Sequence, residues 1–193
     1  MKVLCVVLVL ALFASVARAE VLDYDAKSIQ AKIVYWFFKK TNNGDHGKLE
    51  RRGTDADTYD LLPLDLGKIR DWTTSFDLYR LPTGAAFSQS RRKLLADSDG
   101  VILLVDASPK STKANAASLA ELRKDLKELN YEALPIVVQI VGANDEKDAT
   151  AAAKALGIED LPRLISIPTK GVGVFDTLKA EAKLVLTALR DRN

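Results

Sequence analysis

The side chains that usually carry metal or nucleophilic chemistry are scarce in this sequence. One Cys (Cys5) and one His (His46) exclude an internal disulfide, a cysteine-based zinc site and a histidine cluster. A Ser-His-Asp triad would need His46, which lies in a charged segment with no nucleophile beside it, so we expect an exposed surface residue. Asp106 directly follows an apolar run, residues 101–105, and is a candidate Mg²⁺ carboxylate, although such sites also use a nucleotide's own phosphates.

The composition is that of one ordinary globular domain. The 193 residues include 28 basic and 26 acidic side chains, and 48% are hydrophobic, which is enough for a sizeable core. Nucleic-acid binding requires clustered Lys and Arg, and this nearly neutral chain gives no such indication. We therefore expect no nucleic-acid partner.

Residues 1–19 have the pattern of a secretory signal peptide. Lys2 precedes an uncharged apolar run, residues 3–16, and small residues occupy the two positions, Ala17 and Ala19, that signal peptidase reads. The run is shorter than the roughly 20 residues of a membrane span, so no stable span is expected after its removal. The pattern predicts an exported chain, periplasmic or secreted, with residues 20–193 as the mature domain. The alternatives are an uncleaved anchor, or a misassigned start and a cytoplasmic protein.

Predicted strands and helices alternate along the rest of the chain. Strands 59–66 and 73–81 have a short connection around Gly67 and are expected to form an antiparallel pair, whereas residues 39–58 are polar and predict a long loop. This alternation predicts an α/β sandwich with a mostly parallel sheet and ligands beyond the carboxyl ends of its strands. The other expected strands are 31–38, 101–105, 136–141 and 164–167, and the expected helices are 89–96, 111–130, 148–156 and 174–189.

Three segments carry a resemblance to a known family. They are LPLDLGKIR (62–70), SRRKLLADSDGVILLVDAS (90–108) and GVGVFDTLKAEAKLVLTAL (171–189). Together they resemble the MglA-type small GTPases, Ras-superfamily proteins of bacterial polarity and gliding motility, and the similarity runs from about Tyr24 to Leu189. The resemblance implies a Ras-like three-layer α/β sandwich, GTP with Mg²⁺, and a regulatory partner that stimulates hydrolysis.

The segment expected to bind phosphate departs from the family. A phosphate loop needs glycines whose backbone N–H groups contact the oxygens, followed by Lys and Ser/Thr for phosphate and magnesium. Here Lys40-Thr41 follows bulky rings at residues 36–38 with no glycine before it, which strains the turn and obstructs phosphate. The stretch up to Gly47 is also too short for the usual loop and first helix. The first helix is therefore predicted to be shortened or missing.

The catalytic and guanine-reading segments are altered as well. The family's Pro-Gly-Gln turn is replaced by Pro-Thr-Gly at residues 82–84, which lacks the glutamine that commonly orients water in Ras-type hydrolysis, and Gln89 is expected to be a surface residue. The family's Asn-Lys-x-Asp box corresponds to Asn144 and Asp148 at a wider spacing. The other interpretation of that segment is helix capping by Asn144 or Asp145.

The candidate sites follow from these matches. The catalytic residues stay unknown, and Mg²⁺ candidates are Thr41 and Asp106. The remnant GTP-contact candidates are Lys40, Thr41, Asn144, Asp148, Thr169 and Lys170.

Three hypotheses about function remain open at this point. The first is an MglA-like protein with impaired GTP binding and no cofactor, which acts through a protein partner or self-association. The missing helix would leave the sheet open near Ile33, Tyr35 and Phe37, and an exposed apolar patch of that kind usually marks an association site. The second is a functional GTP-binding protein that uses GTP and Mg²⁺ and hydrolyses GTP slowly. The third is a decayed gene product without a selected function.

Overall fold

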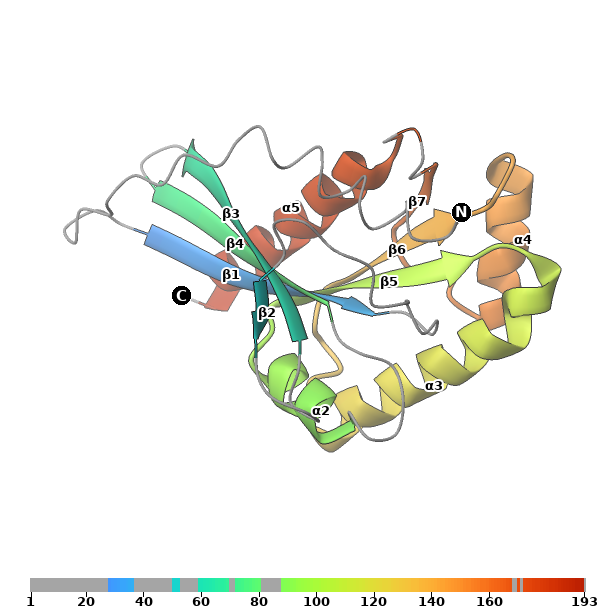
Figure 1. Cartoon of the computed structure of the whole chain (residues 1–193), viewed down its shortest axis with the longest axis horizontal. Helices are drawn as coiled ribbons and strands as arrows, with labels where there is room; N and C mark the ends of the chain where they lie inside the picture. The colour runs from blue at the N-terminus through green and yellow to red at the C-terminus, as the bar shows by residue number, and fades with distance from the viewer. Residues whose placement is uncertain are drawn as a thin grey trace.

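The computed structural model describes residues 28–36, 50–52, 59–69, 72–80, 88–167, 170 and 172–192. Within these residues, seven strands form one sheet in the order β2-β3-β4-β1-β5-β6-β7 (Figure 1). The strands are β1 (Ser28–Trp36), β2 (Glu50–Arg52), β3 (Tyr59–Ile69), β4 (Trp72–Arg80), β5 (Gly100–Asp106), β6 (Ile136–Val141) and β7 (Arg163–Ser166). The helices are α2 (Ser88–Ala96), the 3₁₀ turn η3 (Pro109–Ser111), α3 (Thr112–Glu128), α4 (Glu146–Leu156) and α5 (Val174–Arg192).

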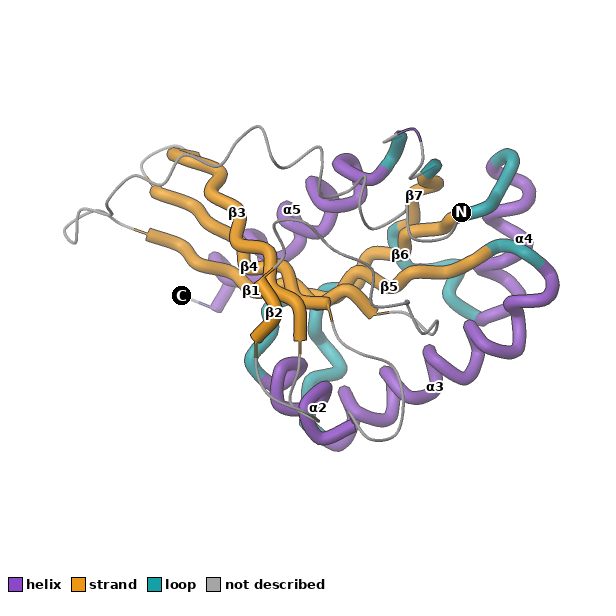
Figure 2. Tube along the Cα trace, in the orientation of Figure 1, coloured by secondary structure: helices purple, strands orange, loops and turns teal. Residues whose placement is uncertain are grey.

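The sheet has a parallel part and an antiparallel part, as the sequence predicts. Strand β1 is central and pairs in parallel with both β4 and β5, and the parallel pairing continues through β6 to β7. Strands β2, β3 and β4 form the antiparallel part at the other end of the sheet (Figure 2). The expected antiparallel pair is confirmed, and the carboxyl ends of β5, β6 and β7 lie along one edge.

Two hydrophobic clusters on opposite faces make the sandwich three-layered. Helix α5 covers one face, and α2, α3 and α4 lie on the other (Figure 1). Strand β5 contributes to both clusters, because successive side chains of a strand point to opposite faces. Val101, Leu103 and Val105 pack toward α3 and α4, whereas Ile102 packs toward α5. A strand buried on both faces accounts for the continuous apolar run that predicts it.

The expected open face of the sheet near Ile33 is not found. Ile33 is fully buried, in a cluster that includes Leu178 and Val185 of α5. Helix α5 extends to Arg192, three residues beyond its predicted end, and covers the face that a missing first helix would leave open. For Ile33 the prediction of an exposed association patch is therefore wrong. Phe37 and the side chain of Tyr35 lie outside the described residues.

The predicted polar loop 39–58 contains a short strand. Strand β2 pairs with β3 through Glu50↔Leu61, Arg51↔Asp60 and Arg52↔Tyr59. Its three residues are charged, and charged side chains are common on edge strands because they discourage pairing with another chain. The rest of the predicted loop, including Lys40, Thr41 and His46, lies outside the described residues, and so does the segment expected to lack the first helix.

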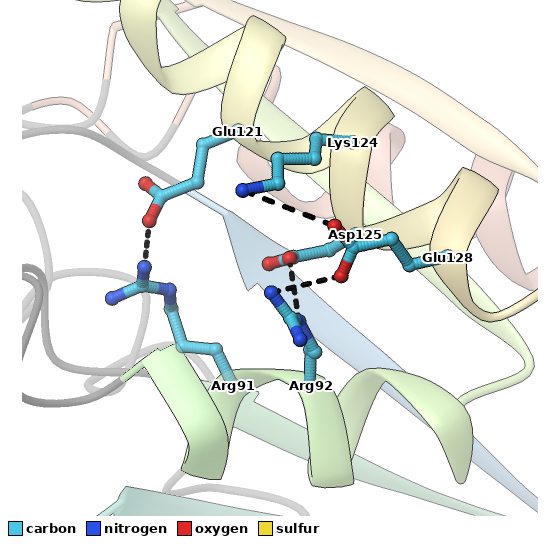
Figure 3. A network of polar contacts seen from close by, with 6 residues as sticks. All are labelled: Arg91, Arg92, Glu121, Lys124, Asp125 and Glu128. Atoms are coloured by element: carbon cyan, nitrogen blue, oxygen red, sulfur yellow. Dashed lines mark hydrogen bonds and ion pairs between the residues drawn. The ribbon is translucent and has the colours of Figure 1, made fainter.

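Helix α2 is joined to α3 by a network of ion pairs (Figure 3). Arg91 is buried and pairs with Glu121, and Arg92 donates to the buried carboxylate of Asp125 at 2.9 Å. Arg92 also reaches Glu128 at 2.9 Å. Exposed ion pairs contribute little individually, but networks with a buried member fix geometry more strongly. The network therefore holds α2 in one position on α3.

Candidate functional site

A cavity of about 560 Å³ opens at the carboxyl ends of β5 and β6, between α3 and α4. This is where an open α/β sheet is expected to bind ligands. Three of the residues proposed from the sequence, Asp106, Asn144 and Asp148, line the cavity together. The other lining residues are Ala107, Ser108, Pro109, Thr112, Asn115, Gly142, Ala151, Ala152, Ala155 and Leu156.

The carboxylate of Asp106 is engaged by the loop that follows β5. One oxygen accepts the backbone N–H of Ser108 at 3.0 Å, and the other accepts the hydroxyl of Ser111 at 2.9 Å. Asn115 also fixes this residue, because its amide donates to the Asp106 carbonyl oxygen at 2.9 Å. The described residues contain no group of three or more His, Cys, Asp or Glu side chains suited to hold a metal. Asp106 therefore closes the loop after β5, and its assignment as a Mg²⁺ ligand remains a prediction.

Asn144 and Asp148 lie at the start of α4 and bind each other. One carboxylate oxygen of Asp148 accepts the side-chain amide of Asn144 at 2.7 Å and its backbone N–H at 3.1 Å. These two hydrogen bonds lower the pKa of Asp148 below its ordinary value, because they favour the ionised form. The carboxylate expected to accept from a guanine edge is thus turned back toward its own loop.

Asp145 caps α4. It lies in an extended conformation at the N-cap position, and its side chain accepts the backbone N–H of Asp148 at 2.9 Å. At the other end, Gly157 adopts the left-handed conformation with φ of 62°, the usual way for a helix to end. The capping interpretation of this segment therefore holds for Asp145.

The turn between β7 and α5 is tightly built. Ile167 and Val172 form an antiparallel bridge, with the N–H of Ile167 donating to the Val172 carbonyl oxygen at 2.9 Å. The exposed Lys170 sits at the tip, its N–H bonded to the carbonyl oxygen of Ile167 at 2.9 Å. Thr169 lies outside the described residues. The structure brings Lys170 to the same edge of the sheet as the cavity but not into its lining.

Some predicted residues are placed and others are not. Gln89 is exposed on α2, which confirms its interpretation as a surface residue. The turn at residues 82–84 lies outside the described part of the chain. The Mg²⁺ and GTP assignments of Lys40 and Thr41 remain predictions for the same reason.

Two features of the structure were missed from the sequence. Glu181 is fully buried on α5, and the helical spacing gives the signal: it lies three residues after Leu178 and four before Val185, within the apolar stripe. Three exposed apolar side chains, Ile167, Val172 and Phe175, also gather at the β7–α5 turn. No sequence pattern distinguishes them from core residues.

Comparison with known proteins identifies the family. No family model matches the chain. It is 36% identical over 190 positions to the mutual gliding-motility protein MglA of Myxococcus xanthus (strain DK1622), with 88% of this chain and 97% of MglA included. The chain therefore belongs to the MglA-type small GTPases of the Ras superfamily. This confirms the resemblance of the three segments and the Ras-like fold class.

The relative also corrects one prediction. Residues 1–19 led us to expect an exported chain, but the relationship extends over 97% of MglA, a cytoplasmic protein. The prediction of export is wrong, because a short apolar run flanked by Lys and small residues is a weak signal when taken alone. None of the helices in the described ranges is long and apolar enough to cross a bilayer. Whether residues 1–19 form a separate segment remains a prediction, since they lie outside those ranges.

This chain and MglA differ in length within the aligned region. The aligned region has 190 positions and includes 88% of this chain, which is about 170 of its 193 residues. About 20 aligned positions of MglA therefore have no counterpart in this chain. This chain is therefore shorter than MglA within the matched region.

Proposed function

We propose that this chain acts in gliding motility or cell polarity as an MglA-type protein that binds GTP weakly and works through contacts with a protein partner. The observation that carries the proposal is the Asn144–Asp148 pair. Both hydrogen bonds from Asn144 fall on the same oxygen of the Asp148 carboxylate, at 2.7 and 3.1 Å, so a guanine edge that uses both carboxylate oxygens would compete with Asn144 for that oxygen. Each hydrogen bond to a charged group contributes roughly 1.5–3 kcal/mol, so this competition lowers nucleotide affinity.

The residues next to the phosphate side support the same proposal. Asp106 already accepts hydrogen bonds from Ser108 and Ser111, so a magnesium ion would compete with both. Thirteen residues, 37–49, separate the end of β1 from the start of β2. An average helix alone takes about 11 residues, which leaves almost nothing for a phosphate loop. The roughly 20 unmatched positions relative to MglA are consistent with a deletion here.

A role in protein contacts requires a surface that persists without nucleotide. The α2–α3 network provides one, because Arg91 and Arg92 anchor α2 to Glu121, Asp125 and Glu128 through protein groups alone. These contacts hold the exposed α2–α3 surface in place whether or not GTP is bound. We propose this surface as the region that a protein partner recognises.

A second candidate function is GTP binding with slow hydrolysis. It is favoured by the cavity at the carboxyl ends of β5 and β6, where Asp106, Asn144 and Asp148 lie together. In this case Lys40 would contact phosphate, Thr41 would bind the magnesium ion, and Thr169 and Lys170 would approach the base. The nucleotide would supply the transferable phosphoryl group and part of the metal's oxygen ligands.

Thermal unfolding distinguishes the two candidates. We expect the melting temperature of the full chain to rise by no more than about 4 °C on addition of about 1 mM GTP with excess Mg²⁺, because a ligand stabilises only by RT ln(1 + [L]/Kd), about 1 kcal/mol at a Kd of about 200 μM. With a micromolar Kd, the same addition would stabilise the fold by about 4 kcal/mol and raise the melting temperature by roughly 8–16 °C. ATP is the control for unspecific effects, and a rise with GTP that ATP does not produce would favour the second candidate.

A further inference from the structure

The carboxyl group of Glu181 is buried without a hydrogen-bond partner. The side chain has no exposed area, and neither carboxylate oxygen makes a hydrogen bond. It lies against Gly100 at the start of β5, where a methyl group in place of the glycine hydrogen would overlap the Glu181 oxygen and the Val185 side chain. Buried polar groups are normally satisfied, so an unsatisfied carboxyl between helix and sheet requires an explanation.

The backbone N–H groups of Val101 and Val137 approach this carboxyl, but neither makes a hydrogen bond of normal geometry with it. The N–H of Val101 donates to the Pro135 carbonyl oxygen at 3.0 Å, and Val137 belongs to the β5–β6 ladder. Both amides favour the ionised form, but the loss of hydration outweighs them and raises the pKa of Glu181 to about 8. The side chain is therefore mostly a neutral acid at pH 7.

The pKa of Glu181 is set by burial and by two backbone amides, and not by a neighbouring charge. Strand β5 has Asp106 at its far end, and Asp99 precedes its first residue. On β7, Arg163 pairs with Glu146 of α4 at 3.2 Å. On β4, Asp77 lies next to Phe76 and so points to the opposite face, whereas Arg80 lies on the same side of the strand as Phe76 and Leu78. On α5 itself, Lys179 lies over the Phe175 ring, and the other cation and anion nearby, Lys183 and Asp176, are exposed.

We infer that Glu181 is a proton-dependent latch for α5: as a neutral acid it allows the helix to pack on the sheet, and when ionised it loosens the helix and the β7–α5 turn. The helix and the turn are connected directly, because the Thr177 hydroxyl donates to the Gly173 carbonyl oxygen at 2.7 Å. Val174 and Leu178 also bury the first turn of α5. Loosening of α5 therefore reaches Lys170 at the tip of the turn. This inference does not depend on whether GTP binds.

The pH dependence of α5 packing follows from the difference between the pKa of Glu181 in the packed and in the open state. The pKa of Glu181 is about 8 in the folded chain and 4.5 in the ordinary, hydrated state. Below 4.5 both states hold the proton, and packing is strongest. Between 4.5 and about 8 the open state loses the proton while the packed state keeps it, so packing weakens as pH rises. Above about 8 both states are ionised, and the effect levels off.

Hydrogen exchange monitored by mass spectrometry on the full chain tests the latch. Protection of α5 amides, corrected for the intrinsic exchange rate, is compared with protection of α3 amides at about pH 6 and about pH 8. We expect α5 to lose protection by on the order of 50-fold relative to α3, and Glu181→Gln to abolish the difference. Glu132→Gln is the control, because Glu132 is exposed and should leave the pH dependence unchanged.

Two results of the hydrogen-exchange experiment would overturn the inference. Equal pH dependence of α5 and α3 in the unmodified chain would overturn the inference, and so would a pH dependence of α5 that survives in Glu181→Gln. If Glu181→Gln fails to fold, the comparison of the two helices in the unmodified chain still decides the question. Glu181→Leu then provides a second neutral variant.

Discussion

Gly173→Ala is expected to destabilise the folded chain by about 3 kcal/mol or more. Gly173 has a φ of 72°, and an added Cβ would overlap the backbone carbonyl oxygen of Ile165. The left-handed conformation alone costs a non-glycine residue roughly 1–2 kcal/mol, and an overlap with backbone adds roughly 1–3 kcal/mol because no side chain can rotate away. Urea unfolding measures the loss.

Gly157→Ala is the matched control for this prediction. Gly157 has a similar φ of 62°, but no atom lies within 4 Å of the added Cβ. It should therefore show the conformational cost alone, about 1–2 kcal/mol. Equal losses in the two variants would mean that the β7–α5 turn is not packed against β7 as described.

Phe76→Ala is the second substitution with a large expected effect, about 3–5 kcal/mol. Phe76 lies on β4 with 1% of its side chain exposed, in one cluster with Ile33 and Leu178. Removal of the ring leaves a cavity between the sheet and α5 that the strands cannot fill by relaxation. The free energy of unfolding in urea is the appropriate measurement.

Phe175→Ala controls for the loss of an aromatic ring as such. Phe175 is 42% exposed at the start of α5 and contacts Lys179, so its removal should cost less than about 1 kcal/mol. A small effect of Phe76→Ala, comparable with that of Phe175→Ala, would contradict the packing of α5 over β1 and β4.

The parallel half of the sheet could be predicted from the sequence because its strands are buried on both faces. Strand β6 has the predicted bounds, Ile136–Val141, and β5 differs from its prediction by one residue at each end. Short, mostly apolar segments rich in Val and Ile between helical segments have few other structures available. Strand β2 could not be predicted, because three charged residues become a strand only through their pairing with β3.

The candidate site was predictable in residue type but not in arrangement. The sequence places Asp106 at the end of one strand and Asn144 and Asp148 in the segment that follows another, and the structure gathers them around one cavity. The partners of these side chains depend on loop geometry, however, which determines that Asp148 accepts from Asn144 and Asp106 from Ser111. The position of Glu181 in an apolar stripe was visible, but its burial follows from the close approach of Gly100.

A titration of fluorescent GTP with the full chain, with and without Mg²⁺, tests the central claim most directly. Weak binding predicts no saturation up to about 100 μM nucleotide, a concentration at which an affinity of about 1 μM would give nearly complete occupancy. Lys40→Ala should then change nothing. Saturable binding with a micromolar Kd that requires Mg²⁺ and disappears in Lys40→Ala would contradict the claim and establish a working nucleotide site.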